Sequence, residues 1–427
     1  MKIEEIYQCY LQCTVISTDT RKIEKNALFV ALRGENFDAN TFAQQAIENG
    51  ALFVIIDDKK YFTDKEKMIL VSDSLKTLQE LALFHRKALG LLIIALTGSN
   101  GKTTTKELIN AVLSRKYNTK ATVGNLNNHI GVPLTLLSFD ENTDIGIVEM
   151  GANHQKEIEF LCTIAAPDYG YITNFGKAHL EGFGGTEGVI KGKTELYNYL
   201  QENNKIAFVN LDDAIQVSKT ENMQRYTFSK EINSDFKVNS VSANPMVTIG
   251  FNTIAIQSHL IGLYNATNIN AAICIGKYFN IDDSDIKEAI ENYIPTNNRS
   301  QLIEKNSNHI VLDAYNANPS SMAAAIANFI QLDSTTKMAV LGDMFELGSE
   351  SLAEHKKIIE LLVSESQIEI YFVGKDFFAN KIASKNMHFY ENYELFAVDF
   401  KKQTVTGNTI LIKGSRGMAL ERTLEMI

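Results

Sequence analysis

Cysteine and proline are scarce in this 427-residue sequence, which has four of the former and five of the latter. Four cysteines in a chain of this length do not form the disulfide framework of a small secreted domain, and we expect all four to be buried thiols. Cys9 and Cys13 have no second ligand pair nearby, which argues against a metal site. The few prolines and the absence of a low-complexity tract predict linkers that are short and ordered.

Long hydrophobic runs are also missing. The longest aliphatic run, "LLIIAL" at 91–96, is far too short to span a bilayer. The first residues, "MKIEEIYQCYLQC", include acidic side chains where a signal peptide has a basic segment and an apolar core. We therefore expect a cytoplasmic protein without a membrane span.

Basic residues are outnumbered, with 41 Lys and Arg against 51 Asp and Glu and a net charge of −10. A nucleic-acid partner is disfavoured, because its phosphates require a basic face. A charged small-molecule substrate is compatible with this composition, since a local basic pocket can lie on an acidic surface. The hydrophobic fraction of 45% and the charged fraction of 22% are typical of a globular protein, which we expect to be a monomer.

The chain is too long for one ordinary core, and the order of its apolar segments predicts three α/β domains. In residues 1–88, three compact apolar strands precede a segment of helical spacing at 74–89, which indicates a small α/β domain. These strands are expected at 27–32, 51–56 and 68–73.

Residues 89–297 alternate between apolar strands and helices, as a mostly parallel sheet does. A more β-rich patch follows at 225–261. The polar segment "ENYIPTNNRSQ" at 291–301 predicts a linker. From 298 to 427 the alternation restarts and ends with a helix after "TILIKGS", which is the pattern of a Rossmann-like domain.

The segment "LTGSNGKTTTKE" (96–107) follows an apolar strand and opens a predicted helix. It is similar to a phosphate-binding loop, although Leu96 occupies the position of the first consensus glycine. A strand, a glycine-rich loop and a helix N-terminus direct backbone N–H groups toward phosphate. Lys102 can reach the β- and γ-phosphates, and Thr103 can ligate Mg²⁺. The alternative is an ordinary turn between strand and helix.

Glu149 ends the predicted strand "DIGIVEM" (144–150) and offers the hard oxygen ligand that Mg²⁺ prefers. The glycine-rich stretch at 174–197 brings His179 and Lys193 toward the same sheet edge. The residues alone do not decide whether these two side chains are ligands or ordinary core and surface groups.

Three further loops are candidate binding segments. The amide-rich "GNLNNHIGVPLTLL" (124–137) could bind a sugar or a phosphate, or could only cap its helix. "LDAYNANPSSM" (312–322) and "VLGDMFELGSES" (340–351) follow strands of the last domain, where α/β sheets bind ligands. Ordinary turn chemistry is the alternative for both.

Together these motifs resemble the ATP-dependent Mur ligases and the folylpolyglutamate synthetases. The shortened loop "TGSNGKTTT" is similar to that family's variant of the phosphate-binding loop. Further matching segments cover about 17 to 422 in the expected order: "STDTRKIEKNALFVALRGENFDANTFAQQAIENGA", "NNHIGVPLTLL", "VEMGAN", "AHLEGFG", "DAYNANPSSM", "LGDMFELG" and "KGSRGMALE". Two positions depart from the family pattern, because Asn298 replaces the usual Gly and Tyr264 the usual His.

The resemblance implies an amide-forming ligase of peptidoglycan synthesis that uses ATP and two Mg²⁺ ions. Within the family the motifs look most like the member whose substrates are UDP-N-acetylmuramoyl-tripeptide and D-alanyl-D-alanine. An acyl phosphate would form on the tripeptide, and the dipeptide amine would then displace phosphate. The first domain would hold the UDP-sugar, the second ATP, and the third would deliver the dipeptide and complete the nucleotide site.

The resemblance also implies the site residues. Lys102, His179 and Lys193 would be catalytic, with Lys193 carbamylated to give an anionic metal ligand and Lys191 as the neighbouring candidate. The implied metal ligands are Thr103, Glu149, His179 and Lys193. The implied ATP-binding residues are Gly98, Ser99, Asn100, Gly101, Lys102, Thr103, Thr104, Asn265, Asn268, Arg299, Asp313 and Asn316. The implied UDP-sugar residues are Ser17, Thr18, Thr20, Arg21, Arg33, Asn127 and Asn128.

Three other functions are compatible with parts of this pattern. Another amide ligase of the same family would add a different amino acid to a different acceptor. A P-loop switch or regulatory ATPase would hydrolyse nucleotide without a carboxylate substrate. A nucleotide-sugar binding protein that has lost catalysis would have no use for the phosphate-loop lysine and the strand-end carboxylate.

Overall fold

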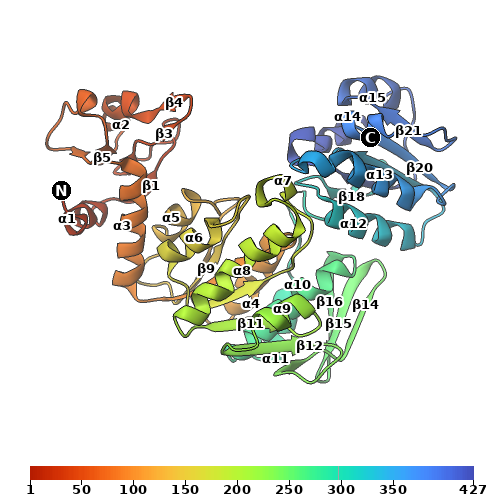
Figure 1. The fold of residues 1–427 in the computed structure, drawn as a ribbon, viewed down its shortest axis with the longest axis horizontal. Helices are drawn as coiled ribbons and strands as arrows, with labels where there is room; N and C mark the ends of the chain where they lie inside the picture. Colours follow the sequence, from red (N-terminus) through yellow and green to blue (C-terminus); the bar gives the residue numbers. More distant parts are fainter. Residues whose placement is uncertain (297) are drawn as a thin grey trace.

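The computed structural model describes residues 1–296 and 298–427 and has three domains (Figure 1). The first and the last domain stand apart as two arms on either side of the central domain. The predicted fold class is confirmed, because each domain is built on an α/β sheet and the two larger sheets are mostly parallel. Among the described residues no helix has the length and apolar character needed to cross a membrane.

The first domain holds a four-stranded parallel sheet, and all three predicted strands belong to it. In spatial order its strands are β1 (Ile16–Ser17), β2 (Leu28–Val30), β5 (Phe53–Ile56) and β6 (Met68–Leu70). The side chains of β2 are fully buried, as expected for a parallel strand that is covered on both faces. The remaining elements are α1 (Ile3–Tyr10), β3 (Arg33–Gly34), β4 (Phe37–Asp38), η1 (Ala39–Phe42), α2 (Ala43–Glu48), η2 (Lys59–Tyr61) and α3 (Ser74–Leu89).

Helix α3 joins the first domain to the central one. The carboxylate of Asp73 caps its first turn by accepting from Lys76 N over 2.8 Å, and Gly90 ends it at φ 64°. The apolar face of α3 is buried against α1 on one side and against α5 and α6 of the central domain on the other. The first domain is therefore attached through a rigid helix.

The four cysteines are free thiols, and only two of them are buried. The prediction of four buried thiols is wrong for Cys9 and Cys13, which are half-buried. Both belong to the N-terminal segment around α1, which was not predicted and lies at the margin of the first domain (Figure 1).

The central domain holds a seven-stranded sheet in which every observed pairing is parallel. In spatial order its strands are β13 (Phe236–Lys237), β12 (Arg225–Ser229), β11 (Ile206–Asn210), β10 (Tyr169–Ile172), β7 (Leu92–Thr97), β9 (Ile145–Glu149) and β8 (Thr119–Ala121). The chain passes from β7 to one side and later returns to its other side. The carboxyl end of β7 is thus a topological switch point, where open α/β sheets bind ligands.

Helices cover this sheet, and a small antiparallel sheet follows it in the chain. The helices are α4 (Lys102–Leu113), α5 (Gly131–Leu136), α6 (Glu157–Ala165), α7 (Leu180–Phe183), α8 (Thr186–Glu202), α9 (Ala214–Lys219), α10 (Tyr264–Tyr278) and α11 (Asp283–Glu291). The small sheet consists of β14 (Ser240–Ala243), β15 (Met246–Phe251) and β16 (Ile254–Ile261), within the predicted β-rich patch.

The last domain holds a six-stranded sheet that is parallel except for its first strand. In spatial order it contains β17 (Gln301–Lys305), β18 (Asn308–Asp313), β22 (Thr409–Lys413), β19 (Lys337–Gly342), β20 (Ile368–Val373) and β21 (Met387–Tyr390). Its helices are α12 (Pro319–Gln331), the short η3 (Gly348–Glu350), α13 (Ser351–Leu362), α14 (Lys375–Ala379) and α15 (Tyr393–Phe400).

Two predictions for the last domain are corrected. The polar strand β17 was not predicted and begins at Gln301, inside the predicted linker. The expected final helix is instead two 3₁₀ segments, η4 (Arg416–Met418) and η5 (Leu420–Met426). Ala419 between them has φ 48°, and this left-handed residue interrupts a continuous α-helix.

Candidate functional site

A cavity of about 1110 Å³ lies where the central and last domains meet. Its wall includes the loop after β7, the ends of β9 and β10, the first turn of α10 and the loop after β18. Leu75 and Gln79 of α3 lie at its edge toward the first domain. Segments at the ends of four strands and the first turn of one helix therefore converge on one space.

The loop after β7 depends on two glycines. Gly98 has φ 141° and Gly101 has φ 78°, which are backbone conformations that residues with a side chain rarely adopt. A Cβ on Gly98 would lie 2.0 Å from Thr173 Oγ1, and one on Gly101 would lie 2.6 Å from Asn268 Oδ1. Glycine at both positions thus lets the loop pack closely and present the N-terminus of α4 to the cavity.

Lys102 begins α4 and curls back over the loop. Its Nζ donates to Gly98 O over 2.7 Å and to Ser99 O over 3.3 Å. Burial lowers the pKa of Lys102; Glu149 opposes this shift and Arg299 adds to it. A lysine held among loop carbonyls in this way can extend to a phosphate group without a change in the backbone.

Glu149 ends β9 inside the cavity wall and is only 2% exposed. Its carboxylate accepts a hydrogen bond from Thr103 Oγ1 over 2.9 Å and one from Asn127 Nδ2 over 2.7 Å. Hydroxyl and carboxylate oxygens are donors that Mg²⁺ prefers. The donor set of Thr103 and Glu149 therefore fits a magnesium ion.

Lys193 is 1% exposed and lies behind the cavity wall. Its Nζ donates to the carbonyl of Ala152 over 3.1 Å and lies 4.9 Å from the ring centroid of Phe183. Burial, with the nearby charge of Lys102, holds its pKa well below the ordinary lysine value. Lys191, the neighbouring candidate, is exposed on α8.

His179 precedes the short helix α7 with φ 53° and lines the cavity. Its Nδ1 is in direct contact with the carboxylate of Glu346, which lies on the loop after β19 in the last domain. The histidine lowers the pKa of Glu346. A predicted metal ligand of the central domain is thus in direct contact with a carboxylate of another domain.

Two amides of α10 face the phosphate loop from the other side. Asn265 and Asn268 are buried, and Asn268 donates from Nδ2 to Asn265 Oδ1 over 2.9 Å. Thr105 Oγ1 donates to Asn268 Oδ1 over 3.1 Å. The bond from Thr105 thus joins α4 to α10 beside the cavity.

The boundary with the last domain contributes a cation. Arg299 lines the cavity, and its guanidinium carbon lies 3.7 Å from the ring centroid of Tyr315. Asp313 accepts from Lys413 Nζ over 2.5 Å and from Ser300 N over 3.2 Å. Both Asp313 and Asn316 also line the cavity.

The two departures from the family pattern have structural counterparts. Asn298 has φ 57°, so it takes up the left-handed conformation that glycine favours. Tyr264 places its hydroxyl 2.9 Å from Ser300 Oγ, and burial raises the pKa of this phenol. The tyrosine therefore anchors the chain next to Arg299.

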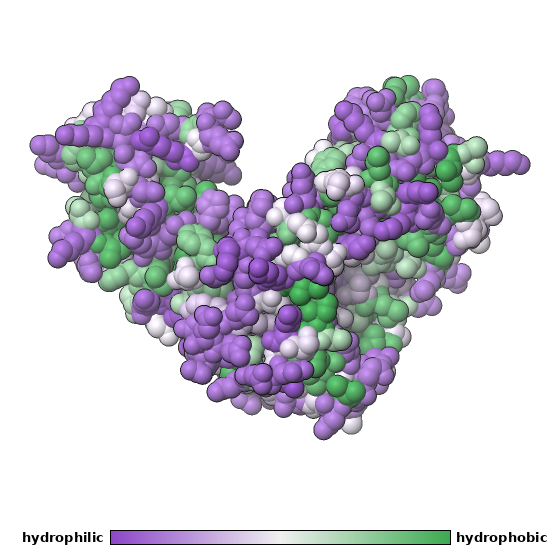
Figure 2. Space-filling model, in the orientation of Figure 1, coloured by the Kyte–Doolittle hydropathy of each residue, from purple (hydrophilic) through white to green (hydrophobic). Residues whose placement is uncertain are grey.

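Most of the predicted residues come together, and seven do not line the cavity. Gly98 and Lys193 lie directly behind its wall. The remaining five belong to the first domain: Ser17, Thr18, Thr20, Arg21 and Arg33. Arg21 is paired with Asp19 over 2.9 Å and Arg33 with Asp57 over 2.8 Å. Figure 2 shows a wide notch between the first and the last domain.

Sequence reasoning missed four residues of the site region: Tyr315, Asn318, Glu346 and Lys413. Asn318 caps α12 and also donates from Nδ2 to Asn100 Oδ1 of the phosphate loop over 2.7 Å. Three of the four lie in the "LDAYNANPSSM" and "VLGDMFELGSES" segments, which were singled out as candidate binding loops. The missing information was which side chains of these loops point toward the central domain.

Three family descriptions match this chain. The Mur ligase family catalytic domain matches residues 12–86, the Mur ligase middle domain matches 96–276, and the Mur ligase glutamate ligase domain matches 298–416. UDP-N-acetylmuramoyl-tripeptide–D-alanyl-D-alanine ligase of Bacillus subtilis is 36% identical, covering 96% of this chain and 92% of its own length. The protein of the same name from Escherichia coli is 34% identical, covering 96% and 93%.

Solved structures that are similar to this chain over nearly its whole length are also MurF proteins. MurF from Acinetobacter baumannii has a TM-score of 0.87 at 29% identity, covering 99% of this chain and 97% of that chain. MurF ligase from Thermotoga maritima, solved in complex with ADP, has a TM-score of 0.84 at 28% identity, covering 98% and 97%.

Proposed function

Because this chain belongs to the Mur ligase family, we propose that it joins D-alanyl-D-alanine to UDP-N-acetylmuramoyl-tripeptide with consumption of ATP. The products are the UDP-linked pentapeptide precursor of peptidoglycan, ADP and phosphate. The relatives named for this reaction support the proposal, since they match 96% of the chain. The observation that carries it is one cavity that combines a phosphate-binding loop, a buried strand-end carboxylate and an arginine from the domain boundary.

The chemistry starts from a carboxylate, which does not form an amide in water without activation. A carboxylate oxygen of the tripeptide attacks the γ-phosphorus of ATP, forming an acyl phosphate while the bond to ADP breaks. The amine of the dipeptide then attacks the acyl carbon, loses a proton and displaces phosphate. Lys102 and Arg299 would offset the phosphate charge and align the groups.

ATP would be bound between α4 and α10. The loop from Gly98 to Thr104 would cradle the phosphates through backbone N–H groups. Asn265 and Asn268 would border the nucleotide, and Asp313 with Asn316 would approach its ribose or adenine from the last domain. The convergence of these side chains on one cavity supports this arrangement, as does the ADP bound by a similar structure.

Magnesium would be held by Thr103, Glu149, His179 and Lys193, where it would neutralise phosphate charge. Lys193 is suited to carbamylation, because burial favours its neutral amine. The amine nitrogen attacks the carbon of CO₂ and loses a proton, which leaves an anionic carbamate. That reaction would convert a cation into an oxygen ligand for the second ion.

The domains would divide the substrates. We assign residues 1–88 to the UDP-sugar, 89–297 to ATP, and 298–427 to the dipeptide and part of the nucleotide site. Ser17, Thr18, Thr20, Arg21 and Arg33 would bind the UDP-sugar together with Asn127 and Asn128 of the central domain. Closing the notch between the arms would bring these groups nearer and exclude water from the acyl phosphate.

Phosphate release tests this function. Release from ATP is expected only when UDP-N-acetylmuramoyl-tripeptide and D-alanyl-D-alanine are both present, with a product heavier by one dehydrated dipeptide. Release that is indifferent to both substrates would instead indicate a switch ATPase. No release under any condition would indicate a binding protein without catalysis.

A further inference from the structure

The loop between β19 and η3 reaches from the last domain to the central domain. The carboxylate of Glu346, at its tip, is in direct contact with His179 Nδ1. The backbone carbonyl of Glu346 accepts from Glu181 N over 3.3 Å, and Gly348 packs against the side chain of Glu181. The loop therefore touches the segment that carries His179 at three points.

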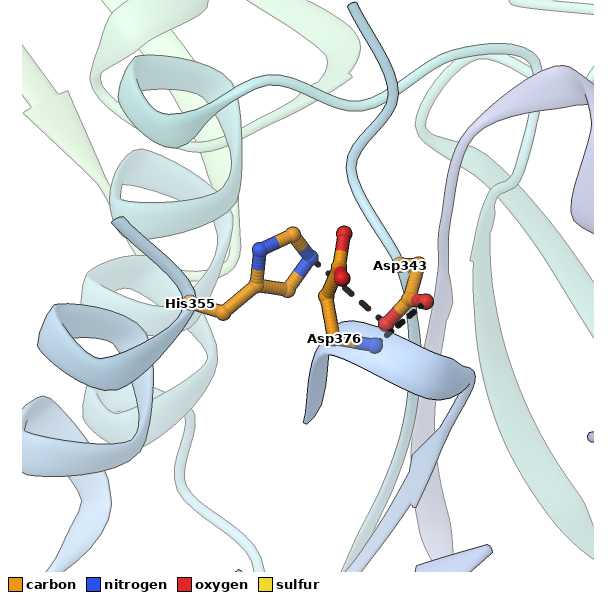
Figure 3. Close-up of side chains that lie close together, drawn as sticks. All are labelled: Asp343, His355 and Asp376. Atoms are coloured by element: carbon orange, nitrogen blue, oxygen red, sulfur yellow. Dashed lines mark hydrogen bonds and ion pairs between the residues drawn. The ribbon is translucent and has the colours of Figure 1, made fainter. Parts of the chain in front are cut away.

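A cluster of three side chains holds the base of this loop (Figure 3). The carboxylate of Asp343 accepts from the backbone N–H groups of Asp376 and Phe377, each over 3.0 Å. Met344 N donates to His355 Nε2 over 2.9 Å, and His355 Nδ1 donates to Ser351 O over 2.7 Å.

Asp343, His355 and Asp376 lie close enough together to hold a metal ion, but the single ring lone pair of neutral His355 already accepts a backbone hydrogen bond. Nε2 of His355 accepts a backbone hydrogen bond, both oxygens of Asp343 accept from α14, and Asp376 accepts from Ser351 Oγ over 2.6 Å. The cluster is thus a hydrogen-bonded network that joins the start of the loop to α13 and α14. It fixes the direction in which the loop leaves β19.

The two ends of the interdomain contact are both held in left-handed backbone conformations. Glu346 has φ 63° and His179 has φ 53°. Such conformations are uncommon for residues other than glycine and concentrate at functional sites. Each of the two domains therefore contributes a residue in an uncommon backbone conformation to this contact.

The ring of His179 makes this contact through its Nδ1. Its Nδ1 is buried and faces Glu346. In the described part of the chain its Nε2 has no hydrogen-bond partner, and the residue lines the cavity. Histidines that bind metals generally donate their second ring N–H to a carboxylate or carbonyl, which fixes the tautomer and the ring direction.

We propose that Glu346 is a positioning residue that holds Nδ1–H of His179, so that Nε2 faces the magnesium site of the central domain. The inference rests on the proposed function, because His179 is a metal ligand only under that function. Since Glu346 belongs to the last domain, docking of that domain completes the metal site. Metal binding and domain position are then coupled, and each favours the other.

Binding of Mn²⁺ alone to the full chain, followed by electron paramagnetic resonance, tests this coupling. Glu346→Ala is expected to weaken Mn²⁺ binding by about 10-fold or more, the usual effect of losing such a partner. Glu346→Gln keeps an acceptor oxygen without the charge. Its Mn²⁺ affinity is expected to lie between those of the unmodified chain and Glu346→Ala. Glu350→Gln is the matched control, because it removes an exposed carboxylate four residues away and should bind as the unmodified chain does.

His179→Ala separates the possible failures. If it binds Mn²⁺ as tightly as the unmodified chain, the metal assignment in the proposed function is wrong and this inference with it. If His179→Ala weakens binding but Glu346→Ala leaves it unchanged or tightens it, only the positioning role is overturned. In turnover, Glu346→Ala should need more Mg²⁺ for half-maximal rate and approach the unmodified kcat at saturating Mg²⁺.

Discussion

Asn318 of the last domain donates from Nδ2 to Oδ1 of Asn100 in the phosphate-binding loop, over 2.7 Å and across 218 residues of sequence. The same asparagine caps α12, where its Oδ1 accepts from Ser321 N over 2.9 Å. One side chain thus starts a helix of the last domain and touches the loop of the central one. The last domain is thereby hydrogen-bonded directly to the loop after β7.

Asn318→Ser separates the two roles of this residue. Serine is a good helix cap but is too short to reach Asn100. We expect the KM for ATP to rise several-fold. The melting temperature should stay within a few degrees, because serine keeps the cap, whose loss would cost about 1 kcal/mol. Steady-state kinetics and thermal unfolding measure both, and an unchanged KM for ATP would contradict the role of the bridge.

Replacing Lys102 by Ala is expected to reduce turnover by about 1000-fold or more, because a charge aimed at the transferring phosphoryl group is lost. The measurement is phosphate release with both substrates present. Lys116→Ala is a suitable control, since this exposed lysine lies beyond the far end of α4, where it donates to Asn280 O over 3.0 Å and contacts the ring of Tyr117. Near-normal turnover in the Lys102 variant would refute the phosphate-loop assignment.

Tyr315 orients Arg299 through the 3.7 Å contact between guanidinium and ring. Cation–π contacts contribute about 0.5–2 kcal/mol, so Tyr315→Ala should raise the KM for ATP several-fold. Tyr315→Phe keeps the ring face and should stay near the unmodified value. If the Phe variant is as impaired as the Ala variant, the hydroxyl matters and the ring contact does not.

His85 gives the stability of the chain a pH dependence. Its Nε2 donates to Phe139 O over 2.9 Å, so the neutral ring accepts from Tyr7 OH at Nδ1 over 3.1 Å. Burial lowers the pKa of His85 below its ordinary value of 6.5. The unfolded chain therefore binds a proton more readily, and stability present above pH 6.5 is lost as the pH falls through the lowered folded pKa.

Urea unfolding at pH 7.5 and at pH 5.5 measures this effect. His85→Gln cannot take up a proton and should show a smaller difference between the two conditions. An equal difference in both proteins would mean that other groups cause the acid sensitivity.

Several elements could be predicted from local sequence because the signal itself is local. The strand before "TGSNGKTTT" and the helix after it follow from an apolar run, paired glycines and helical spacing. Glu149 was found for the same reason, as a carboxylate at the end of an apolar run. The missed strand β17 lies at the edge of its sheet and has no buried residue, so it lacks an apolar run. The final 3₁₀ segments depend on the left-handed conformation of Ala419, which no sequence periodicity predicts.

The sequence by itself determined the three α/β units, the phosphate-binding loop and its family, because strand and helix periods and turn residues act over a few positions. Only the tertiary structure decided that Lys193 is buried while Lys191 is exposed, and that Glu346 meets His179. It also decided that Arg21 and Arg33 pair with carboxylates of the first domain and do not line the cavity. These outcomes depend on how the domains pack against one another, and packing between distant segments leaves no period in the sequence.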